Sequence, residues 1–177
     1  MKFIETPLAG AYVVELEPFH DDRGYFARGW CQKEFEAAGL IAEIRQANIS
    51  SNKHAGTMRG MHYQVPPHGE TKLVRCVRGS LYDVIIDIRE GSETFAKWFG
   101  IELTAKNNKM LYVPEQFAHG FITLEDDTEA TYQVTEFHTP GSERGIRYDD
   151  PAFKIEWPTD VKVISDKDQA WDDFDLT

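Results

Sequence analysis

The segment KLVRCVRGSLYDVIIDIR, residues 72–89, carries the clearest structural signal in the chain. Over residues 81–88 the side chains alternate between two faces, with the period of two that a β-strand has when one face is buried more fully. Residues 72–77 form a second apolar run, and Arg78-Gly79-Ser80 between the two runs has the composition of a tight turn. The segment therefore predicts two strands joined as a hairpin.

Short runs of the same kind lie on both sides of this segment. One short helix that ends at Gly39 is expected at residues 32–38, and strands are expected at residues 11–16, 58–64, 98–103, 110–113, 121–124 and 130–137. Many short strands are typical of a sandwich or barrel, because closing a sheet removes its exposed edges. The chain has no repeat, linker or low-complexity stretch. We therefore expect an all-β fold in a single domain, residues 1–177.

Composition narrows the classes of function. The formal net charge is −11, whereas nonspecific nucleic-acid binding requires a basic surface. No apolar run approaches the roughly 18 residues of a membrane span, and the N-terminus lacks the hydrophobic segment of a secretory signal. Cys31 and Cys76 fit free thiols in a reducing compartment, although the sequence leaves one disulfide open. We expect a cytoplasmic protein that binds neither membranes nor nucleic acid.

A histidine in one of the expected strands is a candidate acid–base group. His62 lies in TMRGMHYQ, residues 57–64, and an imidazole accepts a proton near neutral pH. Alternation places His62 and Gln64 on one face and Arg59 on the other, unless Gly60 introduces a bulge. A lone histidine in a strand is more often structural, so this position alone does not decide between the two interpretations.

Three further positions add to this signal. Lys72 shares the packed face of its strand, where an unpaired ammonium is costly, although a lysine at a strand end can also reach water. Tyr132 shares a face with apolar neighbours and has the ordinary interpretation of a core tyrosine. His119 follows the expected loop VPEQFA, and a loop histidine at a strand mouth suits ligand contact.

Several segments together resemble the dTDP-4-dehydrorhamnose 3,5-epimerase family over nearly the whole chain. They are DDRGYF (21–26), QANIS (46–50), MRGMHYQ (58–64), KLVRCVRGSLYDVIIDIR (72–89), YVPEQFAHGFITL (112–124), TYQVTEF (131–137), IEWP (155–158) and ISDKD (164–168). The combination of R-G-x-H-x-Q, K-L-V-R-C and V-P-x-x-F-A-H-G-F is highly specific. The resemblance implies a cupin-like jelly-roll β-barrel with a few short helices, a homodimer, and no metal or cofactor.

The resemblance also implies a role for each matching residue. His62 would be the general base that removes a proton beside the C4 ketone of a dTDP-sugar, and Asp168 would pair with it. Tyr132 would deliver a proton from the opposite ring face, and Lys72 would stabilise the enolate oxygen. Glu143 would hold the nucleotide end, and the diphosphate and sugar would be held by Arg23, Gln46, Asn48, Arg59 and His119. The cationic residues among them, Arg23, Arg59 and Lys72, would supply the local positive charge that an anionic substrate needs on an acidic protein.

The implied substrate is dTDP-4-keto-6-deoxy-D-glucose, inverted at C3 and C5, and several alternatives remain open. A 3-epimerase, or an epimerase of another 4-keto sugar nucleotide, would use the same residues. The chain departs from the family pattern at Arg28, where an acid is usual, at His138, where an aromatic is common, and at Trp171. These departures leave the nucleotide and the exact sugar open. A sensor that binds a sugar nucleotide without catalysis is a further alternative.

A metal-dependent cupin is the remaining alternative. Metal-binding cupins use an H-x-H step, an acid shortly after it and a later histidine. Here His62 is followed by Gln64, with Glu70 and His119 in roughly the other positions. Glutamine is a poor ligand for transition metals, so the sequence favours a metal-free site. It also lacks a G-x-S-x-G elbow, a P-loop and a Gly-rich dinucleotide fingerprint.

Overall fold

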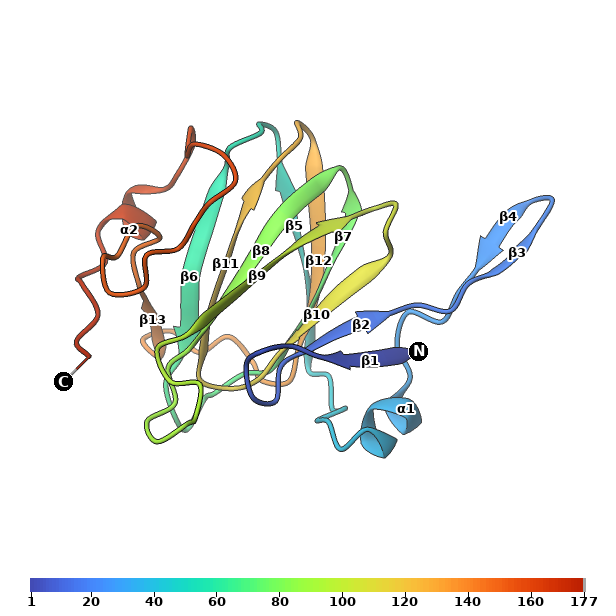
Figure 1. The fold of residues 1–177 in the computed structure, drawn as a ribbon, viewed down its shortest axis with the longest axis horizontal. Coiled ribbons are helices and arrows are strands. Elements are labelled where there is room, and N and C mark those ends of the chain that lie inside the picture. Colours follow the sequence, from blue (N-terminus) through green and yellow to red (C-terminus); the bar gives the residue numbers. More distant parts are fainter. Residues whose placement is uncertain (177) are drawn as a thin grey trace.

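A computed structural model describes residues 1–176, and residue 177, the last of the expected domain, lies outside the described residues. Two sheets face each other to form a barrel (Figure 1). The larger sheet has the order β1 (Lys2–Glu5), β2 (Tyr12–Glu15), β10 (Lys109–Val113), β7 (Lys72–Arg78), β12 (Thr128–Val134) and β5 (Gln46–Asn52). The smaller has the order β13 (Glu143–Gly145), β6 (Met58–Gln64), β11 (Phe117–Thr123), β8 (Ser80–Asp87) and β9 (Trp98–Thr104).

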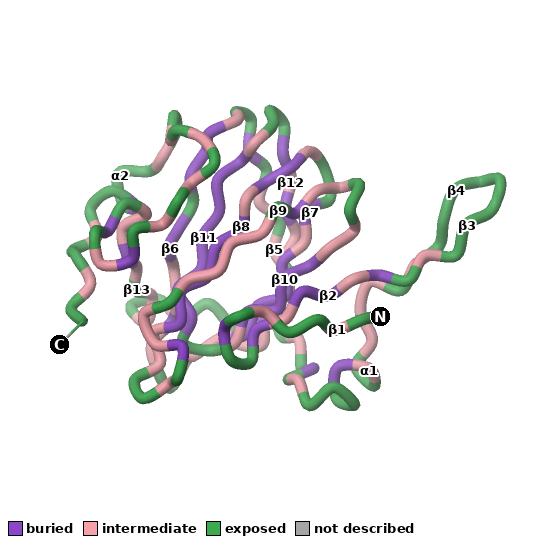
Figure 2. Tube along the Cα trace, viewed as in Figure 1, coloured by how far each residue is buried: buried purple, intermediate pink, exposed green. Residues whose placement is uncertain are grey.

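The main apolar core lies between these two sheets. Val74 and Cys76 of β7 meet Leu81 and Ile85 of β8, and all four side chains are fully buried. Figure 2 shows buried positions running along β8 and β11 in the middle of the smaller sheet. Removing these apolar surfaces from water is the dominant favourable term in folding. The predicted all-β, cupin-like barrel is confirmed.

The predicted hairpin at Arg78-Gly79-Ser80 is wrong. β7 pairs with β10 and β12 in the larger sheet, whereas β8 pairs with β9 and β11 in the smaller one. The turn instead carries the chain from one sheet to the other. Gly79 has a φ of +70°, and a side chain there would meet Thr128. A glycine turn of this kind is a local signal and does not specify which strands pair.

One face of β8 is buried more fully, as the alternation predicts, because every inward side chain is fully buried whereas Tyr82 on the outward face is only half-buried. The outward side chains Val84 and Ile86 are nevertheless fully buried as well. They pack under the segment that follows β13, through Phe153 and Trp157. This segment runs along the outside of the smaller sheet to α2 (Asp166–Gln169), beside β6 (Figure 1).

The N-terminal third contains elements that the strand signals did not reveal. β5 has the polar sequence QANISSN and lies at an edge of the larger sheet. β3 (Phe19–Asp21) and β4 (Gly24–Phe26) form a hairpin that projects from the barrel (Figure 1). The expected helix is α1 (Gln32–Ala37), and its Phe35 is buried against the larger sheet. Within residues 1–176, neither helix has the length or apolar character to cross a bilayer.

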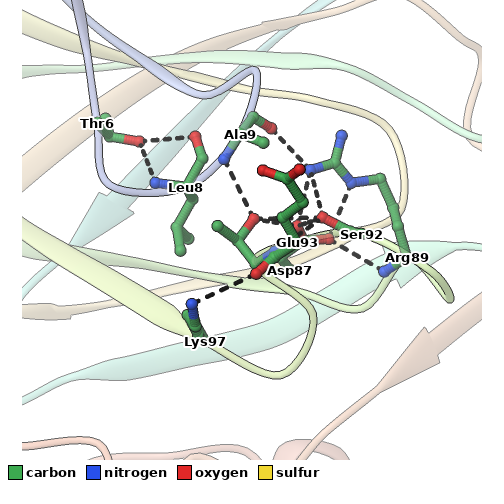
Figure 3. Close-up of polar contacts among 9 residues, drawn as sticks. Thr6, Leu8, Ala9, Asp87, Arg89, Ser92, Glu93 and Lys97 are labelled. Carbon is green, nitrogen blue, oxygen red and sulfur yellow. Dashed lines mark hydrogen bonds and ion pairs between the residues drawn. The ribbon is translucent and has the colours of Figure 1, made fainter.

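A buried carboxylate at the end of β8 ties the N-terminal turn to the barrel (Figure 3). Asp87 accepts hydrogen bonds from Arg89 Nε at 2.8 Å and from the hydroxyls of Ser92 and Thr94 at 2.6 Å. Arg89 and Thr94 in turn contact the backbone of Ala9, at 2.7 and 3.2 Å. Burial alone would raise the pKa of Asp87, but these donors outweigh burial and lower the pKa to about 2.

Asp87→Asn is expected to lower the free energy of unfolding at pH 7 by about 2 kcal/mol. The folded-state pKa of about 2 lies below the usual value, so the charge stabilises the fold above about pH 4 and loses this effect as the pH falls toward 2. Urea unfolding of wild type and Asp87→Asn at pH 7 and at pH 3 measures the difference in unfolding free energy at each pH, and this difference should be smaller at pH 3. Asp149→Asn is the control, because Asp149 pairs with Arg147 on the surface and is worth less than about 1 kcal/mol. A difference between wild type and Asp87→Asn that is constant with pH would contradict the account.

Candidate active site

A cavity of about 570 Å³ lies between the two sheets and carries mostly polar side chains. Its residues come from both sheets and from α2. Of the site residues expected from the sequence, all but Arg23 line it: Gln46, Asn48, Arg59, His62, Lys72, His119, Tyr132, Glu143 and Asp168. The tertiary structure thus brings together side chains spread over more than a hundred residues of chain.

A bulge in β6 determines which side chains reach this cavity. Opposite β11, His62 pairs with His119 and Arg59 pairs with Phe121, so β6 has one more residue than its partner over this stretch. An extra residue reverses the alternation, which is why Arg59 and His62 both face the cavity. Gly60 occupies the bulge with a φ of +125°, and a Cβ there would lie 2.8 Å from His119 O. This position therefore requires glycine.

Gly60→Ala is expected to lower the free energy of unfolding by about 3–5 kcal/mol, combining backbone strain with overpacking against β11. It should also reduce catalytic rate, because Arg59 and His62 flank the bulge. Gly24→Ala separates the two causes: Gly24 has nearly the same φ, +128°, but a Cβ there has open space around it. That variant should lose only about 1 kcal/mol. Equal losses in chemical denaturation would contradict the role of close packing.

The imidazole of His62 is held by a carboxylate from α2. Its Nε2 lies 2.7 Å from Asp168 Oδ1, and the ring remains partly open to the cavity. Ser165 caps α2 by accepting a hydrogen bond from Asp168 N, and Asp168 Oδ2 accepts one from Gly60 N at 3.4 Å. Burial disfavours the charge on Asp168, but the hydrogen bond with His62 contributes most to lowering its pKa below the usual value. Nδ1 is therefore the nitrogen available to a ligand.

Lys72 lies on the cavity wall and is only 7% exposed. Its Nζ is 3.3 Å from the backbone oxygen of His62 and 3.1 Å from Glu70 Oε1. The side chain does not reach water at the strand end, which was the ordinary structural interpretation of this residue. The structure instead places a buried cation next to the candidate base.

Tyr132 faces His62 from the opposite sheet. It belongs to β12, whereas His62 belongs to β6, and both side chains line the same cavity. Burial, followed by the negative charge of Glu70, raises the pKa of Tyr132 above its usual value. The phenol therefore keeps its proton at neutral pH and can act as an acid.

His119 does not lie in a loop, as the sequence suggested. It is a buried residue in the middle of β11, which begins at Phe117, and its Nε2 lies 2.8 Å from Asp83 Oδ1. Sequence reasoning missed Asp83, which is fully buried on β8. The signal was present, because Asp83 shares the inward face of an apolar strand, where a carboxylate needs a partner. Asp83 orients the His119 ring toward the cavity.

The residues considered for a metal have other partners. Gln64 donates to the backbone oxygens of His68 and Phe137 and accepts from Thr139 N, so it joins two loops. Glu70 contacts the Lys72 ammonium, a cation that would repel a metal ion. No cluster of three potential ligands occurs among residues 1–176. These donors do not fit a metal centre.

Two expected binding residues occupy unexpected places. Arg23 sits at the tip of the β3–β4 hairpin with its side chain 90% exposed and paired to Asp21, outside the cavity of its own chain. Glu143 was expected at the nucleotide end, but its Oε1 lies 3.9 Å from His62 Nδ1 and its Oε2 accepts from Lys167 Nζ at 2.6 Å.

The two facing sheets with a polar cavity between them place the chain in the class of cupin-like β-barrel proteins. Comparisons with known proteins identify the family within that class. The family model for dTDP-4-dehydrorhamnose 3,5-epimerase matches residues 5–175. The chain belongs to this family.

Individual relatives agree with this assignment. The dTDP-4-dehydrorhamnose 3,5-epimerase of Shigella flexneri is 43% identical over 95% of this chain and 93% of its own. A crystal structure of the Bacillus anthracis enzyme with TDP and PPi bound has a TM-score of 0.95 at 39% identity, covering 98% of this chain and 99% of that one. A 3'-monoepimerase from Streptomyces bikiniensis in complex with dTDP-quinovose has a TM-score of 0.85 at 32% identity, covering 92% and 83%.

Proposed function

We propose that this protein is a dTDP-4-dehydrorhamnose 3,5-epimerase that inverts C3 and C5 of dTDP-4-keto-6-deoxy-D-glucose without a metal or cofactor. One observation carries the proposal: His62 and Tyr132 line opposite walls of one cavity, with the Lys72 ammonium beside the base. Inversion at carbon requires a base on one face of the sugar and an acid on the other. Binding alone requires neither, so this arrangement favours an enzyme over a sensor.

The chemistry follows from the carbonyl at C4. His62 removes the proton from a carbon next to the ketone, and the electron pair moves to the carbonyl oxygen to give an enolate. A positioned base supplies roughly 10²–10⁴-fold in rate, and most of the rest must come from charge at the enolate oxygen. Lys72 supplies that charge, and His119 assists. Tyr132 then protonates carbon from the opposite face. Since C3 and C5 both flank C4, one set of residues serves both centres.

The remaining cavity residues bind the sugar nucleotide in this proposal. Arg59, Gln46 and Asn48 hold the diphosphate and sugar. The relatives' structures support this substrate class, since one contains TDP with PPi and another dTDP-quinovose. The local cations matter because the chain as a whole has a net charge of −11 and would repel an anion at long range.

We further propose a cytoplasmic homodimer. The β3–β4 hairpin projects from the barrel with exposed positions along both strands (Figure 2). Phe19 and Phe26, paired at its base, are 76% and 75% exposed, and such exposed apolar side chains favour a protein partner. Arg23 on the same hairpin can assist a substrate only in a second chain, because it does not line the cavity of its own. Sedimentation equilibrium, with and without Phe26→Ser, tests this assembly.

Proton exchange in deuterated water tests the activity. Incubation with dTDP-4-keto-6-deoxy-D-glucose is expected to place deuterium at both C3 and C5, as read by NMR. Deuterium at C3 alone would assign a 3-epimerase, as in the Streptomyces relative. No exchange with any of a range of 4-keto sugar nucleotides would remove the proposal. Metal analysis of the purified protein should find no stoichiometric ion.

A further inference from the structure

The ammonium of Lys72 has a defined set of partners. A lysine carries three N–H donors and no acceptor. Nζ donates a hydrogen bond to His62 O at 3.3 Å and forms an ion pair with Glu70 Oε1 at 3.1 Å. Lys72 lines the cavity, so another of its N–H donors can reach the enolate oxygen of the proposed reaction. The two protein contacts therefore fix where the ammonium lies.

Glu70 is itself held in place. Its side chain is only 15% exposed, so its contact with Lys72 is not an ordinary surface pair. The next residue, Thr71, is bound to the end of β12: Thr71 N donates to Thr135 Oγ1 at 2.9 Å, and Thr135 N donates to Thr71 O at 3.1 Å. On the other side of the loop, Gln64 Nε2 donates to His68 O at 3.1 Å. The backbone that carries the Glu70 side chain is thus held on both sides by hydrogen bonds.

Charge gives a second reason for this contact. Lys72 is 7% exposed, and a buried ammonium without a counter-ion is costly. His62 O is a neutral acceptor, so Glu70 supplies the negative charge that makes the buried ammonium tolerable. A carboxylate paired with the ammonium in this way can hold it in place without itself taking part in proton transfer.

We propose that Glu70 is a positioning residue that acts through Lys72, holding its ammonium so that one N–H points at the enolate oxygen. The inference rests on the proposed epimerase function. It predicts that Glu70 matters to the rate of proton abstraction and little to substrate affinity, because the enolate oxygen carries full charge only after the proton has left.

The first test is Glu70→Gln, which removes the charge and keeps the shape. We expect kcat to fall about 10- to 100-fold, the usual effect of removing a group that orients a functional residue, with KM changed less than about 3-fold. Glu70→Asp should recover part of the loss. The control is Glu115→Gln, since Glu115 is an exposed carboxylate beside the same loop and does not line the cavity. It should behave as wild type.

A double-mutant cycle distinguishes positioning from a general structural role. In a Lys72→Met background, Glu70→Gln should change the rate of deuterium exchange by less than about 2-fold, because the group through which it acts is gone. The same 10- to 100-fold loss in that background would overturn the inference, and so would a wild-type rate for Glu70→Gln. Unchanged dTDP affinity verifies that each variant is folded. If Glu70→Gln loses dTDP affinity, Glu70→Asp replaces it as the test. A kcat of Glu70→Asp nearer to wild type with an unchanged KM would then support the inference. A raised KM with a wild-type kcat would overturn it. An inactive wild type would instead contradict the proposed function.

Discussion

Replacing His62 with Asn should reduce both epimerisation and C–H exchange at least about 10³-fold while dTDP affinity stays nearly constant. The imidazole of His62 can accept a proton, is oriented by Asp168, and is more open to the cavity than that of His119, which is also paired with a carboxylate. Asparagine keeps a polar side chain of similar reach but cannot take up a proton. Deuterium incorporation by NMR and dTDP titration calorimetry measure the two quantities.

His54→Asn is the matched control for this variant. His54 is exposed, and its side chain does not line the cavity, so exchange should continue at the wild-type rate. If His62→Asn lost dTDP affinity as completely as activity, His62 would be a binding or folding residue. The proposed chemistry would then lack its base.

Tyr132→Phe should separate proton abstraction from inversion. The base is intact in this variant, so His62 can still form the enolate. Without the phenol, the enolate is reprotonated from the side of His62, and the sugar returns with its original configuration. Epimerisation should fall about 10²–10⁴-fold, the range for a lost general acid, while exchange with deuterated water falls much less. Coupling constants in the NMR spectrum report configuration and exchange in the same sample.

Tyr148→Phe serves as the control, because Tyr148 lies outside the cavity. Its epimerisation and exchange should both match wild type. If Tyr132→Phe inverted the sugar at the normal rate, another acid would have to stand opposite His62. Equal losses of exchange and inversion would instead assign Tyr132 to enolate formation.

The local structure of the barrel strands could be predicted well from the sequence. The strand predicted at residues 58–64 has the same bounds as β6, and β9 and β10 differ from prediction by one residue at one end each. Such strands are indicated by the alternation of neighbouring side chains between two faces, because the backbone of a strand has a period of two residues. The polar strand β5 lacked this signal, and its place is decided by pairing with β12.

The composition of the cavity was predictable only in part. Short motifs were specific enough to nominate nine of its residues, but they could not reveal which side chains contact one another. Asp83 and Glu70 became meaningful only when their partners His119 and Lys72 were placed. For Arg23 the motif predicted a binding residue, but its side chain lies on a projecting hairpin outside the cavity.

By itself, the sequence determined the class of fold, the family and the chemical types available for catalysis, because these depend on residue identity and on periodicity along the chain. Tertiary structure alone decided that β7 and β8 lie in different sheets, that His119 belongs to a strand, and that a bulge at Gly60 turns Arg59 toward the cavity. The reason is that strand pairing and register are set by contacts between distant segments, and a one-residue shift in register reverses every side chain beyond it.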